Sequence, residues 1–251
     1  MRKKPLPVSE PEQGLQDPPG SILSLRGVTI WLPPDRMLLY RQSLDVGSGE
    51  HILILGRAGS GKTRLFRCLC GREVFQEGEV ILFGKRLGPG REASWRQVMT
   101  YVGVIPEGNS FFSSLTCLDN LRLAENRRRD GSGKTKRETA QERNFWLERL
   151  GLRHMEGRRV DSLSPEERRR LNLARACQRH PRLILADHFT RELSPESEEK
   201  LWRDWKAAAA EHFLPGNVPA WIHLSDRQCP GEPADRVWQM ENGQTELGEK
   251  S

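Results

Sequence analysis

The residues with the clearest chemistry lie between His51 and Thr63, where a short apolar run leads into a glycine-rich turn. Residues 52–55 are apolar and partly β-branched, as in a buried parallel strand. The turn from Gly56 to Thr63 matches the pattern G-x-x-x-x-G-K-[ST] at every fixed position. Small residues let backbone N–H groups point at phosphate oxygens, and the following helix adds its positive dipole end. The pattern predicts a phosphate-binding loop formed by Gly56, Arg57, Ala58, Gly59, Ser60, Gly61, Lys62 and Thr63.

Two side chains of this loop have chemistry of their own. Lys62 would place a positive charge beside the β- and γ-phosphates, and Thr63 would offer a hydroxyl to Mg²⁺. Residues 131–135 repeat the end of the motif, but Arg128 stands where the first glycine is required and no apolar strand precedes it. We interpret this second copy as a solvated loop.

Composition describes a protein with enough apolar residues for a core. Of 251 residues, 36% are apolar and 29% charged, and no run of about 18 apolar residues predicts a transmembrane helix. The net charge of +6 is compatible with binding to nucleic acid, acidic lipid or nucleotide, and it does not distinguish these anionic partners. The five cysteines have no C-x-x-C spacing, which favours reduced, buried thiols. The N-terminus lacks the apolar core of a signal peptide.

Strands and helices are predicted to alternate, which favours an α/β fold with a largely parallel sheet. Residues 1–20 hold five prolines and predict a disordered extension. A polar, basic stretch, 126–143, is interpreted as a surface loop. Trp31 ends the first strand and would either stack on an adenine or pack in the core. Predicted strands cover 24–31, 38–46, 52–55, 79–83, 101–105, 182–187, 221–224 and 237–240, and predicted helices 62–70, 115–123, 145–152, 164–177 and 195–212.

Seven further segments follow the phosphate loop in a fixed order. They are 103–107 (GVIPE), 115–116 (LT), 163–164 (LS), 171–176 (LNLARA), 183–187 (LILAD), 193–197 (LSPES) and 235–237 (DRV). Their order and spacing resemble the nucleotide-binding domains of ABC transporters. The resemblance implies one ATP-binding domain over 21–247 with a P-loop NTPase core. It also implies an antiparallel β subdomain and a helical insertion at about 108–163.

The resemblance also implies partners and cofactors. Two such domains, as a homodimer or a heterodimer, would pair head to tail and hold ATP and Mg²⁺ between them. A separate integral membrane permease would anchor the pair to the cytoplasmic face of a membrane. The permease contact is expected beside residues 107–120, where Phe111 and Phe112 are either exposed contacts or core residues. Asp187, at the end of a core strand, would hold Mg²⁺ through water.

Two positions near the expected γ-phosphate depart from the family pattern. Glu107 stands where the family has glutamine; it keeps the size, can ligate Mg²⁺ together with Thr63 and Asp187, and adds negative charge. His188 stands where the catalytic glutamate is expected. A neutral imidazole can orient water or accept a proton. We favour the interpretation that the His188 position no longer does chemistry.

The signature segment is altered as well. Ser164, Pro165, Glu166 and Glu167 replace the serine, two glycines and glutamine of the family. Pro165 has no N–H to offer a phosphate, and Glu166 would repel it. The same residues predict a capping box that starts a helix.

The histidine that senses the γ-phosphate in the family is also missing from its expected place. Ser225 occupies this switch position if Asp226 sets the register, whereas His223 would serve if the strand shifted by two residues. Ser194 stands where an aspartate usually contacts the other subunit.

Three hypotheses follow. In the first, the chain is the ATP-binding subunit of an ABC-type transport system, with its own hydrolysis weak or lost. In the second, it is an active ABC ATPase that uses His188 to orient water. In the third, it is a soluble cassette that acts on nucleic acid or ribosomes. The first is favoured because the third class usually carries two cassettes or added arms, and nucleic acid is the least favoured partner.

Overall fold

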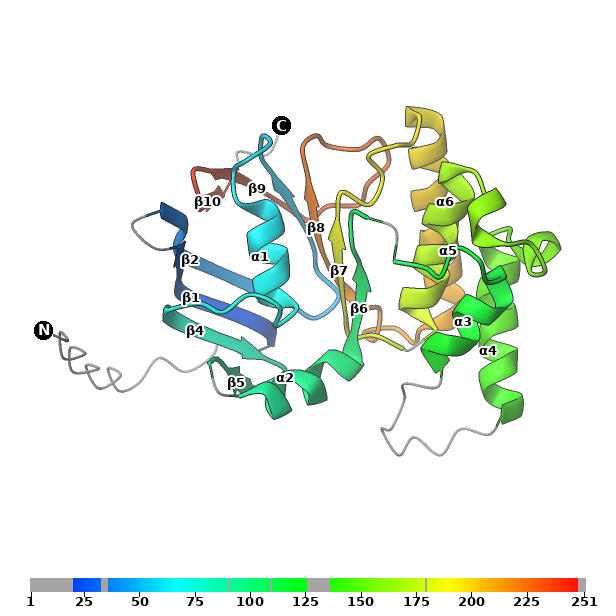
Figure 1. Ribbon diagram of the computed structural model, residues 1–251, viewed down its shortest axis with the longest axis horizontal. Helices are drawn as coiled ribbons and strands as arrows, with labels where there is room; N and C mark the ends of the chain where they lie inside the picture. The colour runs from blue at the N-terminus through cyan, green and yellow to red at the C-terminus, as the bar shows by residue number, and fades with distance from the viewer. Residues whose placement is uncertain are drawn as a thin grey trace, which may run out of the picture.

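The structure is a computed structural model that describes residues 20–32, 36–89, 91–108, 110–125, 136–178 and 180–247. The predicted extension 1–20, apart from Gly20, lies outside these residues, as does the second motif copy at 131–135. Two sheets and a group of helices make up the described chain (Figure 1). This α/β architecture, with one mainly parallel and one antiparallel sheet, confirms the predicted fold class.

The first sheet is antiparallel, with strands in the order β2-β1-β4-β5. β1 pairs with both β2 and β4, and its register with β2 shifts at several points. Such shifts increase the local twist of a strand pair. The strands are β1 (Ser21–Leu32), β2 (Arg36–Gly47), β4 (Glu77–Leu82) and β5 (Lys85–Leu87).

The second sheet carries the phosphate loop and has the order β10-β9-β3-β8-β7-β6. All neighbouring pairs are parallel except β10 with β9. The carboxyl ends of β3, β6, β7 and β8 therefore meet at one edge. The strands are β3 (His51–Leu55), β6 (Val102–Ile105), β7 (Leu183–Asp187), β8 (Ala220–Ser225), β9 (Arg236–Glu241) and β10 (Gln244–Leu247).

Both faces of the central strands β3, β7 and β8 are buried. Leu183 and Leu185 of β7 join an apolar core shared with α1 (Lys62–Leu69) and the antiparallel sheet. Ile184 and Ala186 face the opposite core, built with the helices grouped beside β6 and β7 in Figure 1. This alternation has the period of two that a strand requires, and it fixes which β7 side chains reach each face.

The helices that cover the second face come from two parts of the chain. α3 (Cys117–Glu125) and α4 (Lys136–Arg149) precede α5 (Pro165–Cys177) and α6 (Pro195–His212). α2 (Glu92–Val98) and three short 3-10 turns, η1 (Met99–Tyr101), η2 (Arg153–Met155) and η3 (Val160–Ser162), complete the described helices. Every helix in the described ranges is too short or too polar to traverse a lipid bilayer.

Parts of the predicted secondary structure are wrong or incomplete. The predicted loop 126–143 is helical from Lys136 onward, because this stretch is rich in Lys, Arg, Glu and Gln, which form helices without an apolar face. β5, β10 and α2 were not predicted, since each is short and lacks a clear hydrophobic period. The cysteine prediction is confirmed: all five are buried and unpaired, and burial raises the pKa of Cys68 and Cys70 to about 12.

Candidate functional site

The predicted phosphate loop joins the end of β3 to the start of α1. Gly59 and Gly61 have φ values of 83° and 109°, a region that favours glycine. A Cβ on Gly56 would lie 2.5 Å from the carbonyl oxygen of Met240, so no larger residue fits there. Beside Gly59, by contrast, a Cβ would meet nothing within 4 Å. The loop is a tight turn with open space beside its central glycine, which fits a phosphate group.

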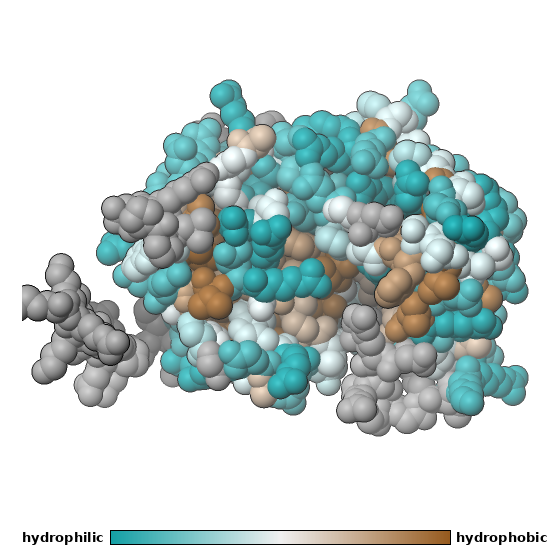
Figure 2. Space-filling view, viewed as in Figure 1, coloured by the Kyte–Doolittle hydropathy of each residue, from teal (hydrophilic) through white to brown (hydrophobic). Residues whose placement is uncertain are grey.

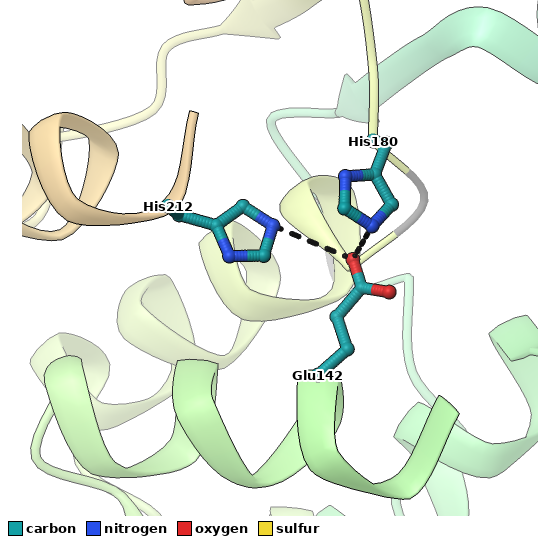
Figure 3. A group of neighbouring side chains, drawn as sticks. All are labelled: Glu142, His180 and His212. Carbon is teal, nitrogen blue, oxygen red and sulfur yellow. Dashed lines mark ion pairs between the residues drawn. The ribbon is translucent and has the colours of Figure 1, made fainter. Parts of the chain in front are cut away.

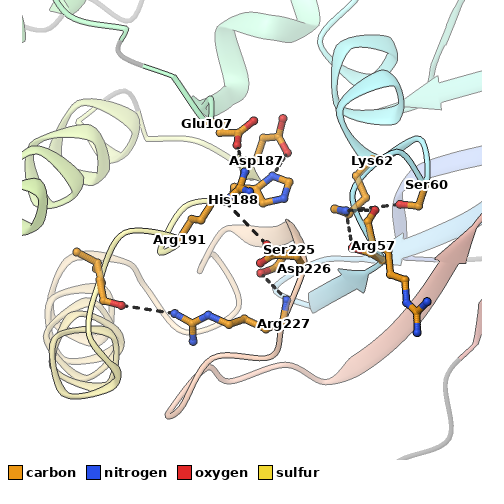
Figure 4. Close-up of polar contacts among 12 residues, drawn as sticks. Arg57, Ser60, Lys62, Glu107, Asp187, His188, Arg191, Ser225, Asp226 and Arg227 are labelled. Atoms are coloured by element: carbon orange, nitrogen blue, oxygen red, sulfur yellow. Dashed lines mark hydrogen bonds and ion pairs between the residues drawn. The ribbon is translucent and has the colours of Figure 1, made fainter.

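Lys62 lies inside this turn (Figure 4). Its Nζ donates hydrogen bonds to the carbonyl oxygens of Gly56, at 2.6 Å, and Arg57, at 3.0 Å. Burial lowers the pKa of Lys62, and the negative charges of Asp226 and Asp187 oppose that shift. The ammonium group is thus held at the loop, facing the carboxylates across the strand ends.

Those carboxylates come from neighbouring parallel strands. Asp187 is the last residue of β7 and is almost fully buried, and Glu107 follows β6. One ligand atom each from Glu107, Asp187 and His188 lies within 4.8 Å of the others. Carboxylate and hydroxyl oxygens are the ligands that Mg²⁺ prefers. With Thr63 in the first turn of α1, the donor set fits that ion.

His188 has an unusual backbone and an occupied ring nitrogen. Its φ is 49°, in the left-handed region, and its backbone N–H donates to the carbonyl of Leu224 at 2.8 Å. The imidazole is buried, with Nδ1 3.0 Å from Oδ1 of Asp187. The loop after β7 is therefore fastened to the end of β8, and the His188 ring is turned toward the Asp187 carboxylate.

Arg191 also belongs to this site, although no sequence motif indicated it. Its guanidinium forms an ion pair with Glu107, and its Nε lies 3.8 Å from Asp226 (Figure 4). Arg191 thereby compensates charge at two strand ends. The sequence feature that could have indicated this role is the position of Arg191, a cationic residue four positions after Asp187 in the loop that follows β7.

The strand register places Ser225, and not His223, at this edge. Ser225 pairs with Leu55, and its carbonyl accepts a hydrogen bond from the Gly56 N–H at 3.1 Å. His223 lies two residues earlier on the same face of β8, fully buried, with Nδ1 2.6 Å from Glu232. The alternative in which β8 shifts by two residues is wrong, because the parallel pairing of β8 with β3 and β7 fixes it.

Trp31 is 37% exposed at the end of β1, so the interpretation as a core residue is wrong. Its backbone N–H donates to Oε1 of Gln76 at 3.1 Å. An exposed indole is available for stacking, so that prediction stays open.

The signature-like segment forms the predicted capping box. Ser164 Oγ accepts from the Glu167 N–H at 3.2 Å, and Glu167 accepts from the Ser164 N–H at 2.6 Å. Glu166 accepts from Arg170, at 2.9 Å, and from the Ser197 hydroxyl, at 2.8 Å. Burial alone would raise the pKa of Glu166, but the hydrogen bonds from Ser197 and Arg170 outweigh it and lower the pKa. The start of α5 thus carries an anion held in place.

A groove of about 380 Å³ lies between β6 and the helices α3 and α5. Its lining includes Val104, Phe112 and Leu123, of which Phe112 and Leu123 are exposed. Figure 2 shows hydrophobic side chains gathered on this face, in the region where β6 and α3 lie in Figure 1. Phe111 is only partly exposed and lies under the guanidinium of Arg175, 4.5 Å from its ring centre.

Comparison with known proteins agrees with this geometry. Residues 39–191 match the family model described as "ABC transporter". The phosphonates import ATP-binding protein PhnC 2 of Oceanobacillus iheyensis is 27% identical over 214 residues, 84% of this chain and 83% of that protein. The methionine import ATP-binding protein MetN of Rhizobium meliloti is 33% identical over 159 residues, 63% of this chain and 43% of that protein.

Solved structures show the same fold at lower identity. CbiO1 from Clostridium perfringens, part of the ABC transporter complex cbiONQ, superposes with a TM-score of 0.77 at 18% identity. It aligns over 91% of this chain and 88% of its own. An ATP-binding cassette in a dimeric post-hydrolysis state with ADP and Pi gives a TM-score of 0.76 at 20% identity, over 91% of this chain and 100% of its own.

Proposed function

The chain belongs to the ABC transporter family as the ATP-binding subunit of a transport system, and from this premise we propose that it binds MgATP with hydrolysis slow or lost. One contrast carries the proposal. The phosphate loop with Lys62 is complete, whereas His188, engaged with Asp187, stands where the catalytic glutamate is expected. The cassette would extend over residues 21–247, with its helical insertion at about 108–163.

Nucleotide binding divides among three groups of residues in this proposal. The loop N–H groups and Lys62 would hold the phosphates, and Thr63, Asp187 and Glu107 would hold Mg²⁺. When bound, Mg²⁺ neutralises charge on the phosphate oxygens. Arg191 keeps the Glu107 carboxylate in place and compensates its charge. Trp31 is exposed and available to stack on the adenine.

Weak hydrolysis is supported by three side chains. A general base must reach the attacking water, yet the His188 ring is buried, and with Nδ1 at 3.0 Å from Asp187 only Nε2 is left to accept a proton. Ser225 at the switch position offers a short hydroxyl in place of an imidazole. In a head-to-tail dimer, Glu166 would face the partner's γ-phosphate with a negative charge, and its bonds to Arg170 and Ser197 hold it at the helix start.

The membrane permease is the proposed partner of the groove beside residues 107–120. Asn120 holds this segment: its side chain accepts from the Phe112 N–H and donates to the Phe112 carbonyl, both at 3.0 Å. The apolar Phe112 side chain is thereby presented at the surface. Relatives named as import proteins support an importer docked at the cytoplasmic face of the membrane. Their names divide between phosphonate and methionine, so no substrate is assigned.

Calorimetry and phosphate release test the proposal. Purified wild-type protein is expected to bind MgATP, and Lys62→Ala to weaken that binding at least about tenfold, since the loop loses the ammonium group proposed to contact the β- and γ-phosphates. Lys206→Ala, on the exposed face of α6, is the matched control and should bind as wild type.

Steady-state phosphate release should not exceed that of Lys62→Ala. Turnover well above that background, abolished by His188→Ala, would overturn the proposal of weak hydrolysis and favour an active ATPase. Absence of any heat with MgATP in the wild-type protein would overturn the proposal of nucleotide binding.

A further inference from the structure

Two histidines and a glutamate converge at a place remote in sequence from the phosphate loop (Figure 3). Glu142 lies on α4, His180 lies between α5 and β7, and His212 is the last residue of α6. His180 Nε2 is 2.5 Å from Oε1 of Glu142, and His212 Nε2 is 3.6 Å from the same oxygen. One ligand atom from each residue lies within 4.8 Å of the others. We propose that these three residues bind a divalent transition-metal ion of the Zn²⁺ class.

The surroundings of the cluster favour a bound cation. The side chains of Glu142 and His212 are only 7% and 12% exposed, whereas that of His180 is 37% exposed. Phe145, Trp146 and Phe213 have ring centres within 4.9 Å of the His212 ring and form an apolar wall. Glu142 contributes a negative charge between the two imidazoles, which favours a cationic ligand over an anionic one. The site is closed on the His212 side and accessible from the side of His180.

The conformation of His180 and the buried Nε2 nitrogen of His212 are two further features of the cluster. His180 has a φ of 48°, a conformation that is costly outside glycine, and its ring stacks on that of His212 at 4.9 Å. Nε2 of His212 is buried without a hydrogen-bond partner among the described residues. Buried polar atoms are nearly always satisfied, and a metal ion would satisfy this nitrogen.

The donor set selects the class of metal. Two imidazole nitrogens and one carboxylate, with a fourth position left for water, are typical of Zn²⁺, whereas Mg²⁺ prefers oxygen ligands alone. Tetrahedral ligands bound at about 2.0–2.2 Å lie roughly 3.2–3.6 Å apart. The Glu142–His212 separation of 3.6 Å matches this spacing, and the Glu142–His180 pair, at 2.5 Å, would open by about 0.7–1.1 Å.

Metal binding at this cluster must be distinguished from metal binding at a second cluster near the nucleotide site. Glu107, Asp187 and His188 could also take a cation, but they belong to the expected MgATP site. The test therefore uses the full-length chain without nucleotide and with Asp187→Asn in every variant. Zn²⁺ affinity is measured by titration in competition with a chelating dye. Co²⁺ serves as a spectroscopic probe, because its visible absorption reports tetrahedral nitrogen and oxygen ligands.

One Zn²⁺ per chain is expected, together with a rise in the midpoint of thermal unfolding on Zn²⁺ addition. Glu142→Gln and His212→Gln should each weaken Zn²⁺ binding by more than about tenfold, because even removing a residue that only orients a ligand costs about 10- to 100-fold. His154→Ala is the matched control: this histidine is exposed in η2, outside the cluster, and its loss should change nothing.

Either of two results would overturn the proposal. One is a Zn²⁺ affinity that Glu142→Gln and His212→Gln leave unchanged, and the other is the absence of Zn²⁺ binding below millimolar concentration. Circular dichroism without metal checks that each variant is folded, and the more exposed His180→Gln replaces any variant that is not. MgATP binding, measured in chains that retain Asp187, is independent of this cluster, so failure of the metal site and failure of the nucleotide site are distinguished.

Discussion

At the scale of single residues, the site is shaped by where charge is placed around the phosphate loop. Lys62 contributes a cation from one side of the strand ends, and Asp187 and Glu107 contribute carboxylates from the other. Arg191 balances Glu107. A triphosphate entering this space would therefore meet one carboxylate more than in a site with glutamine at position 107, and Mg²⁺ would offset it.

Replacing that carboxylate tests the argument. Glu107→Gln should strengthen ATP binding without metal by about three- to tenfold, because one like charge beside the phosphates is removed. The increase in ATP affinity on adding Mg²⁺ should be smaller in this variant than in the wild type. Calorimetry with and without Mg²⁺ measures both effects, and Glu148→Gln on the exposed face of α4 is the control. Equal ATP affinity in the variant and the wild type would contradict this account.

At the scale of elements, residues 164–167 stabilise the start of α5. Ser164 and Glu167 exchange hydrogen bonds, and Pro165 occupies the first helical position, where the missing N–H has no intrahelical partner in any case. The helix dipole also favours the acidic side chains of the first turn. These residues stabilise the start of α5. They offer a neighbouring phosphate few hydrogen-bond donors, because Pro165 has no N–H and Glu166 is an anion.

Loss of the cap should reduce stability. Ser164→Ala is expected to lower the free energy of unfolding by about 1 kcal/mol, the usual cost of removing an N-cap side chain. Urea denaturation followed by circular dichroism measures the change. Ser113→Ala, an exposed serine that precedes α3, should be neutral. If Ser164→Ala matches this control, the capping box contributes nothing to stability.

At the scale of the whole molecule, a buried cluster of one glutamate and two histidines joins distant parts of the second sheet. Glu232, from the loop before β9, lies 2.6 Å from His223 of β8 and 3.0 Å from His51 of β3. Burial by itself raises the pKa of Glu232, but the charge of His223 and the hydrogen bonds from His223 and His51 outweigh it and lower the pKa to about 2. Burial likewise lowers the pKa of His51.

The pH dependence of stability follows from these shifts. A carboxylate whose folded pKa is lowered stabilises the protein above its unfolded pKa of about 4.5, and that contribution is lost as the pH falls toward 2. Glu232→Gln should therefore cost about 3 kcal/mol of unfolding free energy above pH 5, a difference that shrinks toward pH 2. Denaturant titrations across pH measure it, with exposed Glu246→Gln as control. A constant difference at every pH would refute the assignment.

The lowered pKa of His51 acts in the same direction. The folded protein takes up a proton on this side chain less readily than the unfolded chain does, so stability declines as the pH falls below about 6.5. The two groups together predict a protein that loses stability in two acid steps.

The groove proposed to contact the permease also belongs to the scale of the whole molecule, because strand, loop and helix together form it. Phe112→Asp should weaken co-purification with the membrane partner several-fold, since a charge would replace an exposed apolar contact. Leu214→Asp is the control: Leu214 is even more exposed, at 71%, but follows α6 outside the groove. Equal recovery of the partner by both variants would argue against the groove as the contact.

The sequence by itself determined the features that short stretches of chain encode. The glycine turn around Lys62 and the capping box at Ser164 depend on contacts between residues at most six apart, so residue type and spacing were sufficient. The alternation of strands and helices predicted the parallel sheet for the same reason.

Tertiary structure decided what distant segments share. Arg191 meets Glu107 across 84 positions of sequence, and the choice of Ser225 over His223 depends on pairing with β3. Glu142, His180 and His212 come together only when α4, α5 and α6 pack on one face of the sheet. The physical reason is that charge pairing and metal ligation act through space over a few ångströms, whereas separation along the chain does not report that distance.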